Sequence, residues 1–140
     1  MNGFFDLIDG NPKVEIEISG TTAIKKKIIA LFDTGHSGTL ALPVVDLIEI
    51  GAKIRAYQPV IYASGYSSLV YLFGVDVTID GEKKEVFASM IENPNAREAI
   101  AGLQLFSPYV SLIDFKNKSI VFMPEEELKK LASQQPPPQN

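Results

Sequence analysis

The chemistry that the sequence can offer is concentrated in one short segment, Asp33-Thr34-Gly35, with a further glycine at position 38. Asp33 follows the apolar run 28–32, which predicts a strand buried on both faces. A carboxylate at the end of such a strand is costly to bury as an unpaired ion, so it indicates either a simple turn or a chemical role. The glycines permit a tight loop whose backbone amides could point at the carboxylate.

One carboxylate cannot easily supply both proton transfers that peptide hydrolysis needs. The reaction requires a base that takes a proton from water and an acid that protonates the leaving group. Two carboxylates held close together share a proton and can divide these roles. The sequence has no second Asp-Thr-Gly or Asp-Ser-Gly, because Asp80-Gly81 lacks the middle residue and Ala63-Ser64-Gly65 lacks the acid. A carboxylate pair therefore requires two chains, with Asp33 of each meeting on a two-fold axis.

The segment from Ala30 to Pro43 resembles the active-site strand and loop of the retropepsin-like aspartic proteases, in particular the small single-domain members found in prokaryotes. In this family an apolar strand delivers Asp-Thr/Ser-Gly to the active site. A second match is Ala99 to Leu103, where the family has two apolar residues followed by glycine. The resemblance spans residues 13–122 and implies a mainly β fold, a closed retropepsin-like (acid protease) barrel with a flap hairpin and one or two short helices.

The resemblance also implies roles for individual residues. Asp33, Thr34 and Gly35 would be catalytic: Asp33 supplies the carboxylate, Thr34 hydrogen-bonds across the two-fold axis, and Gly35 offers its amide to the carboxylate. Gly102 would support the loop by leaving it room to pass close by. The flap would close over bound peptide with the substrate-binding residues of its tip, Tyr62, Ala63, Ser64, Gly65 and Tyr66. Without the Asp33 motif, the same residues would predict an ordinary surface hairpin.

The sequence departs from the family at two points. His36, the only histidine, follows Asp-Thr-Gly where the best-known retroviral members carry a small residue. We expect His36 to turn to solvent; the alternative is a role in substrate contact or in tuning the carboxylate pair. After Gly102, Leu103-Gln104 replaces the family's Arg or Asn/Asp, which leaves the details of the dimer contacts open.

Local patterns predict the remaining elements. Residues 14–18 alternate between apolar and polar, as a half-buried strand does. Asp80-Gly81 predicts a two-residue hairpin turn. The lead 1–12 could pack on the core or on a partner through its apolar residues, Phe4, Phe5, Leu7 and Ile8. We further expect a long hairpin from strands at 54–63 and 67–79, short helices at 42–51 and 124–131, a last hairpin at 110–123, one domain over 1–132 and a disordered tail over 133–140.

The composition narrows the range of partners. A formal net charge of −4 and a pI near 5.0 argue against nucleic acid, because phosphate affinity comes from clustered Lys and Arg. The basic run Lys25-Lys26-Lys27 is typical of a solvated or edge-protecting stretch. With no cysteine and one histidine, we expect no metal and no cofactor. The sequence has neither a membrane-length apolar stretch nor a signal-peptide pattern, so we expect no membrane partner and a cytoplasmic location.

The preferred hypothesis is a homodimeric aspartic endopeptidase that hydrolyses a peptide or unfolded protein substrate with water activated by an Asp33/Asp33 pair. The alternative is a catalytically inactive retropepsin-like module for peptide binding or dimerisation. The oligomeric state in solution separates the two, because a strict monomer cannot assemble the pair. A third hypothesis treats Asp33 as a phosphoryl acceptor or metal ligand, a role that usually requires further carboxylates or a lysine.

Overall fold

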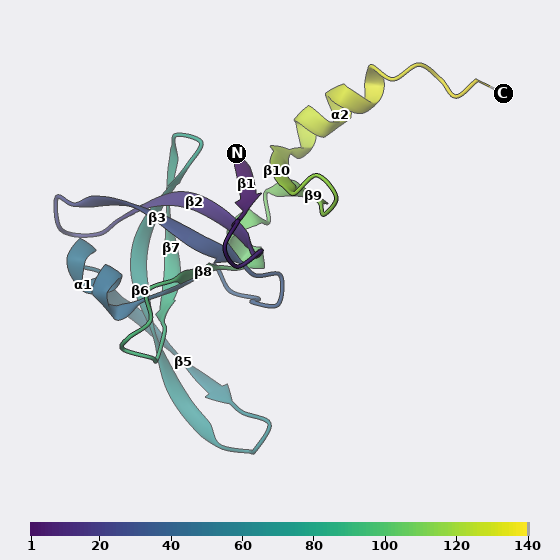
Figure 1. Cartoon of the computed structure of the whole chain (residues 1–140). Helices are drawn as coiled ribbons and strands as arrows, with labels where there is room; N and C mark the ends of the chain where they lie inside the picture. The colour runs from purple at the N-terminus through teal and green to yellow at the C-terminus, as the bar shows by residue number, and fades with distance from the viewer. Residues whose placement is uncertain (140) are drawn as a thin grey trace.

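Ten strands within residues 1–139, the part of the chain that the structure describes, form one continuous sheet in the computed structural model (Figure 1). Their order in the sheet is β5-β6-β7-β4-β8-β3-β2-β1-β10-β9, and β6 also pairs with β2. The elements in chain order are β1 (Asn2–Phe5), β2 (Pro12–Ser19), β3 (Lys25–Phe32), β4 (Leu40–Leu42), α1 (Val44–Ile50), β5 (Lys53–Ile61), β6 (Ser67–Ile79), β7 (Glu82–Met90), β8 (Ala99–Ala101), the 3₁₀ helix η1 (Leu103–Phe106), β9 (Tyr109–Asp114), β10 (Ser119–Pro124) and α2 (Glu125–Ser133).

The pairing of β6 with β2 closes part of this sheet into a barrel. It places Ile18 opposite Val77 and completes a ring of six strands, β2, β6, β7, β4, β8 and β3. Closure removes the open edges of the ring. Strand β5 extends the sheet on one side, and β1, β10 and β9 extend it on the other. The expected mainly β class, with a closed barrel and short helices, is therefore confirmed.

The barrel is filled by alternate residues of its strands. In β2 the apolar residues Val14, Ile16 and Ile18 are almost fully buried, as their alternation predicted. In β6 the buried residues are Val75, Val77 and Ile79, at the end of the strand that belongs to the ring. The other end of β6 continues outward as one strand of the long hairpin with β5.

Strand β3 follows the same rule, so the expectation that it is buried on both faces is wrong. Ala30 and Phe32 face the core, whereas Ile29 is 51% exposed on the outer face of the barrel wall. A continuous apolar run cannot distinguish these two environments. In the lysine run, Lys25 to Lys27 pair with β2 on one side, and β8 pairs with β3 only at 30–32, so the edge-protecting role stays a prediction. Lys26 also pairs with Asp46 and Glu49 of α1, and the bond to Asp46 contributes most to raising the Lys26 pKa.

Left-handed backbone conformations occur where the sequence predicted turns. Asp80 and Gly81, with φ of 51° and 80°, form the turn between β6 and β7. Gly51, with φ of 67°, ends α1. Pro43 lies at the N-cap of α1. These positions confirm the predicted hairpin turn and the predicted first helix.

The N-terminal lead contains strand β1, which lies between β2 and β10. Gly3 is opposite Val14 of β2 and Ile120 of β10, so the two ends of the described chain meet in one sheet. Beyond β1 the chain turns sharply before β2. Leu7 and Ile8 lie in this turn and are fully exposed, so packing on the core is wrong for these two residues.

The C-terminal helix α2 projects from the β9–β10 hairpin (Figure 1), and none of its residues is buried. It confirms the predicted second helix but ends at Ser133, one residue beyond the predicted domain boundary at 132. Residues 134–139 form neither strand nor helix. Asn140, part of the predicted tail, lies outside the described residues, and disorder of the tail stays a prediction. Among the helices of residues 1–139, none has the length and apolar character needed to cross a membrane.

Candidate active site

Asp33 is the first residue of the loop that joins β3 to β4. Its side chain is partly buried, and the Oδ1 atom accepts a hydrogen bond of 2.8 Å from the amide of Gly35. The Asp33 amide donates to the carbonyl of Ala101 at 3.0 Å, which continues the pairing of β3 with β8. Thr34 and Gly35 are exposed. The carboxylate is therefore held by the backbone, and its loop is accessible from solvent.

The segment that follows β8 fixes the Asp33 loop through backbone hydrogen bonds. The amides of Gly102, Leu103 and Gln104 donate to loop carbonyls, at 2.8 Å to Thr39, 2.9 Å to His36 and 3.2 Å to Gly38. Gly102 approaches the loop so closely that a Cβ there would be 2.3 Å from the carbonyl oxygen of Gly38 and 2.6 Å from that of His36. Real Cβ atoms do not come this close to backbone oxygens. Glycine at position 102 is thus a geometric condition for this loop.

The expectation that His36 turns to solvent is wrong. Its ring lies between Gly38 and Gly102. A Cβ at Gly102 would be 2.4 Å from the ring atom Cδ2, and a Cβ at Gly38 would be 3.0 Å from Nε2. Within residues 1–139, Nε2 is buried and has no hydrogen-bond partner. Two glycines that are distant in sequence leave a space that the imidazole fills. The sequence showed each glycine but not that they flank one ring.

A cluster of three aromatic rings lies directly beneath the loop. Phe32, the residue before Asp33, packs edge-on against Phe106 of η1 and Phe122 of β10, with ring centroids 5.2 Å and 5.1 Å away. Phe106 and Phe122 stack at 4.4 Å. All three are buried. Sequence reasoning missed this cluster, because only their apolar character was visible and their contact joins three distant segments.

The predicted flap is present as the β5–β6 hairpin, but its tip is not brought to Asp33. The tip is a turn in which the Gly65 amide donates to the Tyr62 carbonyl at 2.9 Å and the rings of Tyr62 and Tyr66 stack at 6.0 Å. Ala63 and Ser64, within the turn, are exposed. Within residues 1–139 no hydrogen bond joins this turn to the Asp33 loop, and the hairpin projects away from the barrel (Figure 1).

An apolar pocket lies at the base of this hairpin. It is lined by Leu69, Val70, Tyr71, Phe73, Met90 and Glu92. None of these residues belongs to the Asp33 loop, so the single chain keeps its apolar pocket and its carboxylate apart. In the described residues, no three His, Cys, Asp or Glu side chains form a group that could hold a metal ion.

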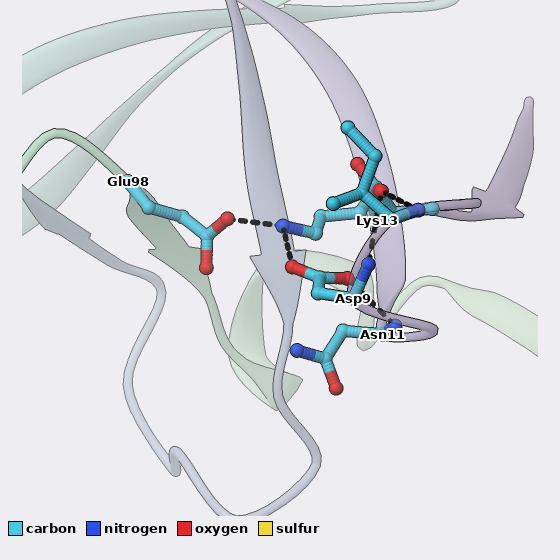
Figure 2. A network of polar contacts seen from close by, with 6 residues as sticks. Asp9, Asn11, Lys13 and Glu98 are labelled. Atoms are coloured by element: carbon cyan, nitrogen blue, oxygen red, sulfur yellow. Dashed lines mark hydrogen bonds and ion pairs between the residues drawn. The ribbon is translucent and has the colours of Figure 1, made fainter.

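Lys13, a buried lysine of β2, supports the site from the side. Its ammonium pairs with Asp9 at 2.9 Å and with Glu98, as Figure 2 shows. Asp9 lies in the β1–β2 turn and Glu98 directly precedes β8, so one ammonium ties both segments to β2. The bond to Glu98, followed by that to Asp9, raises the Lys13 pKa, and the bond to Lys13 is the largest cause that lowers the Asp9 pKa.

Replacing Glu98 with glutamine is expected to lower the free energy of unfolding by about 1 kcal/mol, because the buried ammonium loses one of its two carboxylates while Glu98 itself is half exposed. Urea denaturation measures this change. The same substitution made in a Lys13→Met chain should cost much less, since the ammonium is already gone. An equal cost in both chains would contradict the pairing.

The pH dependence of this network follows from the lowered pKa of Asp9 and the raised pKa of Lys13. The folded pKa of Asp9 is below its ordinary 3.8, so its contribution is complete above that value and is lost as the pH falls through the lower folded pKa. The folded pKa of Lys13 is above its ordinary 10.5, so its contribution is complete below that value and is lost as the pH rises through the higher folded pKa. The contributions of Asp9 and Lys13 are therefore both complete between pH 3.8 and 10.5, and urea denaturation across this range measures them.

Comparison with known proteins supports the barrel fold of the chain. No protein-family model and no curated protein sequence matches the chain. Among solved structures, the chain is similar to EIAV protease complexed with the inhibitor HBY-793, at a TM-score of 0.50 and 15% sequence identity. The match covers 73% of this chain and 90% of the protease chain. At this identity the likeness shows the fold alone, and the fold of the chain is retropepsin-like.

Proposed function

We propose that the chain is an aspartic endopeptidase that works as a homodimer. The observation that carries the proposal is the Asp33 carboxylate, fixed by the Gly35 amide at the start of an accessible loop in a retropepsin-like barrel. The solved neighbour is a protease, which supports the same class of reaction. One chain contributes one such carboxylate, so the reaction requires the Asp33 loops of two copies to meet on a two-fold axis.

In this dimer the two Asp33 side chains share one proton. The ionised carboxylate takes a proton from water as the water oxygen adds to the peptide carbonyl carbon, and the protonated partner gives its proton to the carbonyl oxygen. As the C–N bond breaks, the carboxyl group that took the proton from water gives it to the leaving nitrogen, and the other carboxylate takes a proton from a hydroxyl group of the tetrahedral intermediate, so the pair again holds one proton. The Gly35 amide donates to Oδ1 of Asp33, which leaves Oδ2 to exchange protons with water and substrate. Thr34 braces the two loops across the axis, and the hairpin tip, residues 62–66, closes over the peptide.

Cleavage of an unfolded protein tests this proposal when it is followed from pH 4 to 8 with the molecular mass measured in the same buffers. Activity is expected from a dimer, with a bell-shaped profile that peaks on the acidic side of neutrality, because one proton must be shared. A flat profile over this range would count against a carboxylate pair. A well-folded monomer without cleavage would favour the catalytically inactive peptide-binding module.

A further inference from the structure

The turn between β1 and β2 exposes two large apolar side chains to solvent. Leu7 is 101% exposed and Ile8 is 97% exposed, more than any other large apolar residue of the described chain. Scattered apolar residues are normal on protein surfaces, but adjacent ones at full exposure gain nothing from the fold that displays them. Such a pair is typical of a surface that becomes buried on association.

The turn is ordered by its own hydrogen bonds. The Asp6 carboxylate accepts the amide of Ile8 at 2.7 Å and that of Asp9 at 3.3 Å, and the Asp6 backbone bonds to Gly10 and Asn11 at 2.9 Å each. Asp9 is in turn paired with the buried ammonium described above (Figure 2). The apolar side chains are therefore presented on an ordered turn, and little backbone entropy remains to be lost when they are buried.

The strand register places this turn beside the candidate active site. Lys13 of β2 lies opposite Leu31 of β3, so the chain that enters β2 runs next to the chain that leaves β3 toward Asp33. In Figure 1 the β1–β2 turn and the β3–β4 loop accordingly lie at the same end of the sheet. Leu103, whose amide binds the Asp33 loop, is also 46% exposed. Exposed apolar side chains thus occur in two segments that adjoin the Asp33 loop, the β1–β2 turn and the start of η1.

We propose that the turn of residues 6–11 is the contact through which a second copy of this chain binds, with Leu7 and Ile8 of each copy packing on the other beside the paired Asp33 loops. This inference rests on the proposed function, because the need for a second Asp33 identifies the partner. A two-fold axis through the Asp33 loops brings the same end of both sheets together and buries the same patch on both copies. The turn lies at that end.

Sedimentation equilibrium of the full chain over a dilution series tests this contact. Ile8→Ser is expected to raise the dimer dissociation constant by at least about a hundredfold. The symmetric dimer contains Ile8 twice, so the substitution removes two buried apolar side chains. Ile48→Ser is the matched control: Ile48 is 73% exposed on α1, and its replacement should leave the constant unchanged. Both substitutions are at exposed positions, and circular dichroism checks that the fold is retained.

A second readout uses the absence of cysteine from the chain. Leu7→Cys carries one environment-sensitive fluorophore, whose emission should shift to the blue as the concentration rises through the dimerisation range. An unchanged dissociation constant in Ile8→Ser, or a wild-type chain that stays monomeric, would overturn the contact. A dimer that Ile8→Ser dissociates but that cleaves no substrate would support the contact and overturn the proposed function instead.

Discussion

Replacing Asp33 with asparagine is expected to lower kcat/KM for peptide cleavage by at least about 10⁴-fold. One substitution removes both the base and the acid of the dimer, and each is worth about 10²–10⁴-fold. Asparagine has nearly the same shape, and its side-chain oxygen can still accept the Gly35 amide. The fold and the dimer should therefore persist. Asp76→Asn is the matched control, since Asp76 pairs with Lys83 on the β6–β7 hairpin, and it should cleave normally.

Mixing the two proteins shows whether the carboxylates act in pairs. With equal amounts of wild-type and Asp33→Asn chains, random exchange leaves roughly half of the original wild-type dimers, so activity should fall to about half. Unchanged activity after full exchange would mean that one chain suffices. Turnover by the purified Asp33→Asn protein at the wild-type rate would remove Asp33 from the mechanism altogether.

Replacing Gly102 with alanine is expected to disrupt both stability and cleavage. The new Cβ would lie 2.3 Å and 2.6 Å from two backbone oxygens of the Asp33 loop, so the loop must move. Overpacking of this kind costs about 1–3 kcal/mol. Urea denaturation measures the loss of stability, and cleavage of an unfolded protein measures the displacement of Asp33.

Gly81→Ala separates a general loss of stability from displacement of the site. Gly81 has a φ of 80° and open space around it, so alanine there costs about 1–2 kcal/mol of backbone strain far from the loop. Cleavage at a permissive temperature should survive this change but not Gly102→Ala. Adding His36→Ala to Gly102→Ala should not restore activity, because the closest contact is to a backbone oxygen. Wild-type stability and cleavage in Gly102→Ala would contradict the close approach.

The sequence was informative where one local rule decided the outcome. Asp80-Gly81 specified its turn through the left-handed backbone that both residues adopt, and the alternation in β2 specified which side chains enter the core. The placement of Asp33 at the end of an apolar strand also followed from local order. In each case the deciding residues are neighbours in the chain.

The sequence was uninformative where distant segments decide the outcome. The His36 Nε2 atom is buried because Gly38 and Gly102 both lack a Cβ, and Gly102 reaches the ring only through the pairing of β8. Ile29 is exposed because β3 is a barrel wall, although its neighbours are as apolar as those of a doubly covered strand. The role of Thr34 and of the flap tip stays a prediction, since both depend on molecules beyond the single chain.

The pairing of β1 with β10 inside one chain has a consequence for how activity would be controlled. Residues 2–4 lie opposite 119–121 of the same copy, so the terminal strands need no second molecule to complete their ladder. Folding and association are then separate equilibria. At concentrations below the dissociation constant, the amount of dimer grows with the square of the chain concentration. Under the dimeric mechanism, halving expression would reduce proteolysis fourfold in that range. The abundance of the protein would therefore control its activity more steeply than in proportion.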